Sequence, residues 1–335
     1  MTVVSSLRPV SGTAEEILAL LREWDAAPAP EPLVVATSGS TGAPKRVVLS
    51  RDAMRASALA TQARLGGPRR WVLNLPPTYV AGVQVLYRSV VAGTEPVLDG
   101  EEVVAGRSYI SLVPTQLYRR LKDGRDVEGL ARFDAVLVGG GPMAPGLRDE
   151  AEGRGIRIVQ TYGMSETCGG CVYDGLPLDG VELRIGPTDS GDGEVLVRGP
   201  ILFDGYEDEP ERTAAALRDG WFHTDDLGEI GQDGRLRVTG RRDDVIISGG
   251  LKVPATEVER MLAQHPRIRE VAVVGVADEE WGERVVAFGV TDGSTVDVDD
   301  LVTPHEWTPK QWIGLEALPL LPNGKVDRVA LRAMA

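Results

Sequence analysis

Short apolar runs alternate with longer amphipathic segments through the first half of the chain, and this alternation constrains the fold more than any other feature. The apolar runs are typical of buried strands and fall at residues 33–36, 71–75, 107–113, 133–138 and 156–159. Segments with helical periodicity fall at residues 13–24, 50–65, 82–92, 115–122 and 145–153. Strands that alternate with helices of about ten residues pair in parallel. The sequence therefore predicts an α/β fold built on a helix-covered, mainly parallel sheet.

The pattern changes at about residue 180 to short strands between glycine turns. Strands at residues 181–185, 194–198 and 235–239 predict a small antiparallel β subdomain. After the charged segment 240–244, the pattern predicts a strand at 245–248, a helix at 255–264, strands at 271–276 and 284–290, and a polar tail. We therefore expect an N-terminal domain at residues 1–240 and a small, mobile α+β domain at residues 241–335.

The charge balance of the chain excludes several functions. With 50 acidic and 36 basic residues the formal net charge is -14, which argues against a binder of nucleic acid or of anionic membranes. No apolar run approaches the roughly 20 residues that cross a bilayer. The N-terminus also lacks the basic-then-apolar pattern of a leader. We expect a cytoplasmic enzyme that binds anions only where glycines and cations gather locally.

A loop rich in hydroxyls and glycines follows the first predicted strand. Its glycines let backbone N–H groups approach an anion, its hydroxyls add donors, and its lysine adds charge. The candidate phosphate-binding residues are Thr37, Ser38, Gly39, Ser40, Thr41, Gly42 and Lys45. The spacing differs from the G-x-x-x-x-G-K-[ST] pattern of nucleotide hydrolases. A polyphosphate loop and a flexible surface turn are the two interpretations.

Four further polar segments that contain glycine lie in predicted loops, where α/β proteins bind ligands. Three glycines follow the fourth strand and suit either the approach of a flat ring or a tight turn. Glu166, just past the fifth strand, suits Mg²⁺ together with phosphate oxygens, or is a solvated loop residue. Asp226 can accept hydrogen bonds from a ribose diol or cap a turn. Lys325, after an Asn-Gly pair, is by itself more typical of a solvated turn.

The two cysteines, Cys168 and Cys171, form a C-x-x-C motif. A redox pair would require a βαβ setting in which the motif opens a helix. A structural zinc site would require two further ligands, and the three histidines are scattered along the chain. The motif alone therefore favours neither function.

The order of these segments closely resembles the adenylate-forming superfamily, which comprises acyl-CoA ligases, luciferases and adenylation domains of peptide synthetases. The resemblance rests on the opening loop, Tyr-Gly-x-Ser-Glu-Thr, Thr-Asp-Asp, Gly-Arg-x-x-Asp, Ser-Gly-Gly and Asn-Gly-Lys, and it covers the chain from Pro32 to the C-terminus. It implies an enzyme that takes ATP, Mg²⁺ and CoA, activates a carboxylate as an acyl-adenylate, and transfers the acyl group to the thiol.

The resemblance also implies roles for individual residues. Thr37 to Lys45 would hold the β- and γ-phosphates, Lys325 would bridge the carboxylate and the α-phosphate, and Asp243 would be the hinge of the small domain. The other implied roles fall on Gly139, Gly140, Gly141 and Tyr162 beside the adenine, Thr161 and Gly163 elsewhere in the nucleotide site, Glu166 with Mg²⁺, Thr167 at the α-phosphate, Asp226 and Arg241 at the ribose, and Ser248, Gly249 and Gly250 on the face that admits the thiol of CoA.

Within the superfamily, residues 76–93, 111–117 and 165–168 resemble the o-succinylbenzoate:CoA ligases of menaquinone synthesis. The last match gives Cys168 a plainer explanation than redox chemistry. The o-succinylbenzoate substrate has two carboxylates, and Arg88, on an otherwise apolar predicted helix, would bind the one that is not activated. The implied acyl-pocket residues are Tyr79, Arg88, Thr115 and Ser165.

Other interpretations stay open at this point. Arg88 could face solvent from the polar side of its helix, and the chain would then be an aryl- or medium-chain acyl-CoA ligase. A non-catalytic protein that holds a nucleotide or acyl-adenylate is disfavoured by the joint presence of Lys325, Glu166 and Asp226. A carrier-protein adenylation domain is less favoured because no carrier segment is recognised in the chain.

The sequence departs from the family pattern in three places. About 36 residues precede the phosphate loop, so an N-terminal subdomain would be largely missing, and a homodimer would cover the sheet face left exposed. Tyr79 stands where many members have His or Phe, and Asp225 stands where Gly is usual. These two changes would retune the acyl pocket and the ribose contact.

Overall fold

The computed structural model describes residues 5–37, 45–98, 108–123, 127–143, 146–187, 193–291, 293, 296, 301–302, 304–322 and 324–335. The chain divides into two compact units. The first comprises residues 1–184, 196–224 and 231–236. The second comprises residues 185–195, 225–230 and 237–335.

The first unit is organised around a six-stranded sheet of order β10-β9-β8-β7-β6-β5. Strands β5 to β8 are parallel, whereas β9 and β10 run antiparallel to their neighbours. The strands are β5 (Arg70–Val72), β6 (Ser108–Leu112), β7 (Ala135–Gly139), β8 (Ile158–Met164), β9 (Gly169–Tyr173) and β10 (Leu176–Pro177). The predicted mainly parallel sheet is confirmed, and β9 and β10 extend it.

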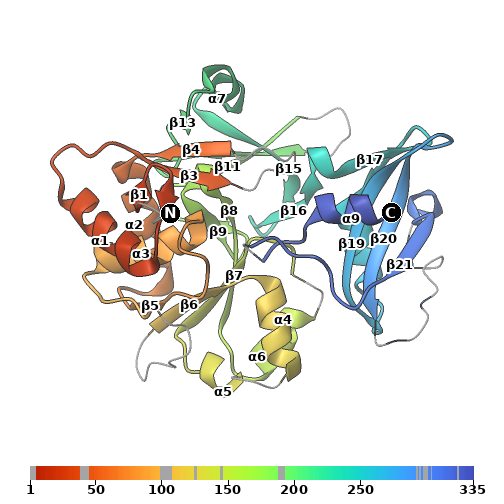
Figure 1. The fold of residues 1–335 in the computed structure, drawn as a ribbon, viewed down its shortest axis with the longest axis horizontal. Helices are drawn as coiled ribbons and strands as arrows, with labels where there is room; N and C mark the ends of the chain where they lie inside the picture. The colour runs from red at the N-terminus through yellow and green to blue at the C-terminus, as the bar shows by residue number, and fades with distance from the viewer. Residues whose placement is uncertain are drawn as a thin grey trace. The chain divides into compact units, whose positions relative to one another are not determined.

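Each face of this sheet carries its own helices (Figure 1). The side chains of the strands alternate between the two faces. On one face, Ile110 and Val136 pack in a core with α4 (Pro114–Asp123), α5 (Val127–Leu130) and α6 (Leu147–Gly153). On the other face, the Tyr109 hydroxyl donates to the carbonyl of Leu65 at 2.9 Å. This face is covered by α2 (Arg51–Leu65) and α3 (Val80–Ala92), with α1 (Ala14–Ala26) packed on α3. Burial on both faces explains why the strands read as continuous apolar runs.

Two of these helices begin at the start of their predicted segments, 13–24 and 50–65, and each has a capping side chain. The backbone N–H of Glu16 donates to Thr13 Oγ1 at 3.3 Å, and the Glu16 carboxylate accepts from the Thr13 N–H at 2.8 Å. Ser50 Oγ accepts from the N–H of Ala53 at 3.4 Å. Each cap satisfies a backbone donor that the first helical turn leaves unpaired. The predicted helix starts are confirmed.

A three-stranded antiparallel sheet of order β13-β4-β3 contains the first predicted strand of the chain. It consists of β3 (Leu33–Thr37), β4 (Lys45–Leu49) and β13 (Gly205–Tyr206), and α7 (Pro210–Ala216) follows β13. The two-residue strands β1 (Ser6–Leu7) and β2 (Val10–Ser11) pair with each other and contact β3. The strand expected at 33–36 is confirmed. Strand β4 was not predicted, because it begins with two cations and reads as part of the preceding polar loop.

The strands after residue 180 form a five-stranded sheet of order β11-β12-β15-β14, with β16 paired to β15. They are β11 (Glu182–Gly186), β12 (Gly193–Arg198), β14 (Leu217–Arg218), β15 (Trp221–Ile230) and β16 (Leu236–Arg241). The three strands that the sequence predicted here are confirmed. Strand β15 was not predicted, because its ten residues mix aromatic, acidic and hydroxyl side chains without a regular period.

The second unit also contains a sheet of order β18-β17-β20-β19, with β21 parallel to β20. Its strands are β17 (Val245–Ser248), β18 (Leu251–Pro254), β19 (Ile268–Asp278), β20 (Gly282–Thr291) and β21 (Gln311–Gly314), and its helices are α8 (Ala255–Leu262) and α9 (Arg328–Met334). Val273 belongs to the core that contains α8 residues, whereas Ala272 and Val274 belong to the core that contains Leu331 of α9.

The predicted polar tail beyond residue 290 is wrong, because it contains β21 and α9. Leu318 and Leu331 in this segment are buried against the second unit's sheet. A Cβ on Gly289 would lie 2.1 Å from the Trp312 ring, so this glycine makes room for the indole. The apolar residues that anchor the segment are too widely spaced to produce a local periodic pattern.

The helices of the described chain are of ordinary length for a globular protein. The longest, α2, has 15 residues. Of the helices that the structure describes, none is long and apolar enough to cross a membrane.

Candidate active site

The two ends of the predicted phosphate loop are held together by strand pairing. Thr37, the last residue of β3, lies opposite Lys45, the first residue of β4. The intervening candidates are outside the described residues and comprise Ser38, Gly39, Ser40, Thr41 and Gly42. The strand register therefore places Thr37 and Lys45 side by side, one at each end of the predicted loop.

Lys45 and Glu166 both contact the side chain of Tyr206. The ammonium of Lys45 lies 5.7 Å from the centre of the Tyr206 ring, within the range of a cation–π contact. The Tyr206 hydroxyl donates to Glu166 Oε1 at 2.9 Å. Tyr206 stands on β13 opposite Val47 of β4, so the small sheet places this ring beside Lys45. Sequence reasoning missed Tyr206, because it lies 40 residues after Glu166 and no local pattern marks it.

Glu166 has the chemistry of a Mg²⁺ ligand. Its side chain is buried, and of its two carboxylate oxygens only Oε1 has a hydrogen-bond donor among the described residues. Mg²⁺ is commonly held by one or two carboxylates together with substrate phosphates. One buried carboxylate next to a phosphate loop therefore fits a Mg²⁺ ion that arrives with a nucleotide. No group of three or more acidic, histidine or cysteine side chains in the described part of the chain forms a separate metal cage.

The turn η1 (Ser165–Thr167) is held by hydrogen bonds between the Thr167 side chain and the neighbouring backbone. The Thr167 hydroxyl donates to the Gly169 carbonyl at 2.7 Å and accepts from the Met164 N–H at 2.9 Å. Thr167 is fully buried, so in this structure its side chain holds the turn. Its predicted contact with the α-phosphate stays a prediction.

The residue after this turn is tied to the helices beneath it. Cys168 adopts a left-handed backbone conformation with φ 51°. Its carbonyl accepts from Gln84 Nε2 at 2.7 Å and from Ser57 Oγ at 3.2 Å. Burial raises the pKa of the Cys168 thiol, which keeps the sulfur protonated and unreactive. Neither Gln84 nor Ser57 was predicted, since each reads as part of an amphipathic helix.

Glycines shape the carboxyl ends of β7 and β8. Gly139 pairs with Thr161, and a Cβ on Gly139 would lie 2.2 Å from Thr161 Oγ1. At Gly163, with φ 157°, a Cβ would lie 2.1 Å from the Gly169 carbonyl oxygen. Gly140 and Gly141 are exposed at the strand end. The strands therefore approach closely here, and the glycines at their ends leave space without side chains that suits a flat ring. The predicted contacts of these glycines and of half-buried Tyr162 with adenine stay predictions.

The predicted acyl-pocket helix is α3, and Arg88 is buried in it. Arg88 is 6% exposed, its guanidinium carbon lies 4.9 Å from the centre of the Trp71 ring, and Nη2 donates to the Tyr173 hydroxyl at 3.4 Å. Its Nε has no partner, and no carboxylate of the described residues forms an ion pair with it. The alternative in which Arg88 faces solvent is therefore wrong.

The other predicted acyl residues lie at the starts of three elements. Tyr79 is the half-buried residue before α3, and Gly82 in the first turn lets the backbone of Pro76 approach, since a Cβ there would lie 2.1 Å from the Pro76 carbonyl. Thr115 is in the first turn of α4, and buried Ser165 begins η1. Their contact with a substrate stays a prediction.

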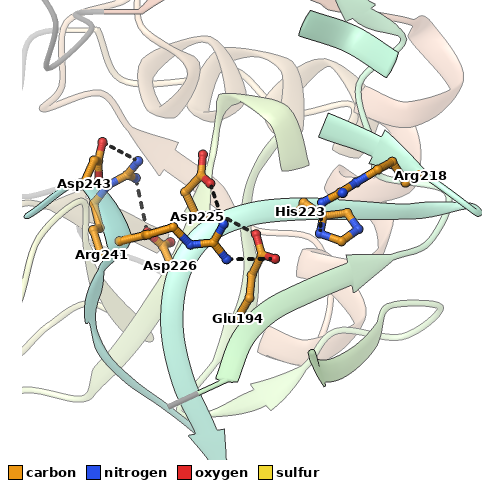
Figure 2. Close-up of polar contacts among 8 residues, drawn as sticks. Glu194, Arg218, His223, Asp225, Asp226, Arg241 and Asp243 are labelled. Atoms are coloured by element: carbon orange, nitrogen blue, oxygen red, sulfur yellow. Dashed lines mark hydrogen bonds and ion pairs between the residues drawn. The ribbon is translucent and has the colours of Figure 1, made fainter. Parts of the chain in front are cut away.

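In the second unit, the predicted ribose and hinge residues form one ion-pair group. Figure 2 shows Arg241 between Asp226 and Asp243. Arg241 Nη1 lies 3.1 Å from Asp226 Oδ1, and Nε lies 2.8 Å from Asp243 Oδ1. Burial lowers the pKa of Arg241, but the carboxylates of Asp243 and Asp226 outweigh it and raise the pKa above its ordinary value. The hinge candidate and the ribose candidate thus share one cation.

A second arginine binds the neighbouring acid. Arg242 lies 3.2 Å from Oε2 of buried Glu194 and 4.0 Å from Oδ1 of Asp225. Asp225 has φ 60°, a left-handed conformation that explains why glycine suits this position. The backbone N–H of Asp225 donates to Glu194 Oε1 at 3.3 Å, so this acid supports the strained residue. Sequence reasoning missed Glu194 and Arg242.

The remaining candidates are on turns of the second unit. Gly249 and Gly250 have φ of 57° and 81° in the β17–β18 turn, next to buried Ser248. The Gly249 N–H donates to the Trp281 carbonyl at 2.8 Å. Lys325 is exposed on a hairpin whose Leu321 N–H donates to the Lys325 carbonyl at 2.7 Å. These positions are compatible with the predicted thiol-access and lysine roles, which stay predictions.

The geometry of the first unit is that of an α/β protein that binds a nucleotide. Three glycines and Glu166 follow the carboxyl ends of β7 and β8 in a helix-covered parallel sheet, which is where α/β proteins bind nucleotides. Comparison with protein families identifies the family of this chain. The AMP-binding enzyme family matches residues 25–207, and the family of AMP-binding enzyme C-terminal domains matches residues 257–325. The chain therefore belongs to the AMP-binding enzyme family, and the resemblance found in the sequence is confirmed.

The chain is also similar to individual proteins, one of them a curated relative and others solved structures. A probable 2-succinylbenzoate–CoA ligase from Mycobacterium tuberculosis is 42% identical over 341 residues, which cover 95% of this chain and 88% of the relative. The o-succinylbenzoate CoA synthetase from Bacillus subtilis, in complex with its acyl-adenylate intermediate, is 29% identical with a TM-score of 0.77 over 89% of this chain and 68% of that one. The same enzyme in complex with ATP and magnesium ion has a TM-score of 0.76 at 29% identity and covers 89% and 69%.

Proposed function

We propose that this protein is an AMP-forming acid–thiol ligase that activates 2-succinylbenzoate. It joins the acid to ATP as an acyl-adenylate with loss of pyrophosphate, and then transfers the acyl group to CoA with loss of AMP. The observation that carries the proposal is that Arg88 is buried and forms no ion pair with a carboxylate of the described residues, in a chain 42% identical to a probable ligase for this substrate.

The chemistry of the substrate explains why Arg88 matters. 2-Succinylbenzoate has one carboxylate that reacts and one that stays charged on the ring. A buried cation is costly without an anionic partner, and a guanidinium can bind a carboxylate through two parallel hydrogen bonds. Arg88 supplies such a group from a helix that is otherwise apolar. The ring carboxylate would therefore complete an ion pair that the protein leaves open.

The first half-reaction is displacement at the α-phosphorus. The oxygen of the succinyl carboxylate attacks phosphorus, and pyrophosphate leaves with the electrons of the broken P–O bond. Lys45 and the loop from Thr37 would hold the leaving pyrophosphate, and Lys325 would lie between the carboxylate and the α-phosphate, where negative charge develops. Mg²⁺, held by Glu166 and phosphate oxygens, neutralises phosphate charge when bound.

The ribose and the hinge would be coupled in the second unit. Asp226 would accept from the ribose diol, and Arg241 Nη1, 3.1 Å from Asp226 Oδ1, orients this carboxylate. After the adenylate forms, the C-terminal domain, which we place at residues 241–335, would turn about Asp243. Ser248, Gly249 and Gly250 would then replace Lys325 and admit the thiol, which attacks the acyl carbon and releases AMP.

A panel of acids tests this function. The protein is incubated with ATP, Mg²⁺ and CoA together with 2-succinylbenzoate, benzoate, octanoate or malonate, and AMP release is measured. We expect 2-succinylbenzoate to be used best by a wide margin. Preference for benzoate or octanoate would support the aryl- or medium-chain alternative, and no AMP release with any acid would support a non-catalytic binder.

Location and assembly are part of the proposal. ATP and CoA are metabolites of the cytoplasm, and we place the enzyme there. We also propose a homodimer, which would cover apolar side chains that a single copy exposes, such as Leu59 on α2. Light scattering on the purified protein distinguishes a dimer from a monomer.

A further inference from the structure

An ion pair between buried Glu259 and half-buried Arg328 joins α8, β19 and the segment that carries Lys325 in the second unit. Glu259 of α8 is 7% exposed. Its Oε1 lies 2.8 Å from Arg328 Nη1, and its Oε2 accepts from Arg328 Nη2 at 3.1 Å. Both partners are also bound to β19: the Val273 N–H donates to Glu259 Oε1 at 2.7 Å, and Arg328 Nη1 donates to the Val273 carbonyl at 2.7 Å.

Arg328 lies three residues after Lys325, and the chain between them has a fixed path. Leu320 and Val326 form a bridge at the stem of the hairpin that holds Lys325. The N–H of Asp327 donates to the Pro319 carbonyl at 2.8 Å. The Asp327 carboxylate then caps α9 by accepting from the Ala330 N–H at 2.9 Å. The position of Arg328 therefore fixes the side of the hairpin that leads from Lys325.

The pair is suited to fixing a position because both carboxylate oxygens of buried Glu259 contact the Arg328 guanidinium. Burial lowers the pKa of Arg328, but the Glu259 carboxylate outweighs it, and the pKa lies above its ordinary value. The hydrogen bond from Arg328 Nη2 to Oε2, together with the ion-pair contact of Nη1 with Oε1, constrains both side chains more than a single contact would. Val273 belongs to the core formed with α8, so the pair stands on a rigid part of the unit.

We propose that Glu259 is a positioning residue for Lys325. It holds Arg328 against β19 and thereby sets the hairpin that presents the lysine to the carboxylate and α-phosphate in the first half-reaction. This inference rests on the adenylating role proposed above for Lys325. It predicts that loss of the Glu259 charge slows adenylation and spares the second half-reaction, in which Lys325 takes no part.

The test uses Glu259→Gln in the full chain. Glutamine keeps the length of the side chain and an oxygen for the Val273 N–H, but it loses the charge that holds Arg328. Adenylation is measured as pyrophosphate release without CoA, and thioester formation is measured from supplied acyl-adenylate and CoA. We expect kcat of adenylation to fall about 10- to 100-fold, as for a displaced catalytic group, with KM for ATP and thioester formation within about twofold of wild type.

A matched control is available on the same helix. Glu257 pairs with Arg260 one turn along α8, away from the lysine segment. Glu257→Gln should leave both half-reactions unchanged. Equal loss of both steps in Glu259→Gln would show a general structural role and overturn the inference, as would full adenylation activity.

A second variant and the wild type keep the outcomes distinct. Arg328→Lys keeps the positive charge but loses the two guanidinium nitrogens that contact Glu259. If Glu259→Gln does not fold, Arg328→Lys must show the selective loss of adenylation. Full adenylation activity in Arg328→Lys would overturn the inference. If the wild-type protein forms no adenylate with 2-succinylbenzoate, the proposed function fails. If the wild type does and both variants match it, only the role of Glu259 fails.

Discussion

Arg88 in the first unit and Arg328 in the second are both arginines held largely out of water, but they are satisfied in opposite ways. Arg328 has a buried glutamate, Glu259, within 2.8 Å. Arg88 has the face of Trp71 and the hydroxyl of Tyr173, and no ion pair with any acid that the structure describes. The ion pair of Arg328 stabilises the fold, whereas the charge of Arg88 is left for a ligand.

The magnitudes support this distinction. A cation–π contact contributes about 0.5–2 kcal/mol, whereas taking an ion out of water costs several kcal/mol. The Trp71 ring therefore offsets only part of the cost of burying Arg88. A ligand carboxylate would offset the rest, and the proposed substrate carries one more carboxylate than its reaction uses.

The largest expected effect concerns the lysine that the Arg328 pair supports. Lys325→Ala should lower the rate of adenylation about 100- to 1000-fold, because it removes a cation aimed at developing charge. Thioester formation from supplied adenylate should survive. The exposed Lys122, which pairs with Glu150 on the surface, provides the control Lys122→Ala. Equal loss of both half-reactions would contradict the role of Lys325.

The second effect compares the two arginines directly through stability. Arg328→Met should lower the free energy of unfolding by about 3 kcal/mol, because it leaves the Glu259 charge buried without a partner. Arg88→Met should change the free energy of unfolding by less than about 1 kcal/mol, or raise it, because an apolar chain replaces an unpaired charge. Chemical denaturation of the two variants measures both values. A loss in Arg88→Met as large as that in Arg328→Met would show that Arg88 has a structural partner.

The smallest effect concerns a neighbour of Arg88 one turn away on α3. Gln84 donates to the Cys168 carbonyl next to the Glu166 turn, so Gln84→Leu should lower kcat/KM about five- to tenfold, the equivalent of about 1 kcal/mol. The loss should be the same for acids with and without a ring carboxylate, because Gln84 supports the turn rather than the substrate's charge. A loss confined to the dicarboxylate would assign Gln84 to substrate recognition.

Local sequence patterns predicted the framework well. The strand and helix alternation predicted the parallel sheet and the helices that begin after Thr13 and Ser50, because this signal arises from neighbours in sequence. The order of the polar segments predicted the family. Strand β21 and helix α9 were missed, because isolated apolar residues such as Leu318 and Leu331 bury them against distant strands.

The partners within the candidate site could not be predicted in the same way. Tyr206 reaches Glu166 across 40 residues, and Arg328 reaches Glu259 across 69. Such pairs depend on how sheets and helices bring distant segments together, and no spacing rule encodes them. Arg88 was recognised by its contrast with an apolar helix, but only the structure shows that it is buried without an acid.

The most direct test of the account compares 2-succinylbenzoate with 4-oxo-4-phenylbutanoate, the same acid without the ring carboxylate. We expect the wild-type protein to prefer 2-succinylbenzoate about 100-fold or more in kcat/KM, the equivalent of about 3 kcal/mol for one buried charge pair. In Arg88→Met the preference should fall to within about threefold. Equal use of the two acids by the wild type, or an unchanged preference in Arg88→Met, would contradict the claim that Arg88 is kept for the substrate.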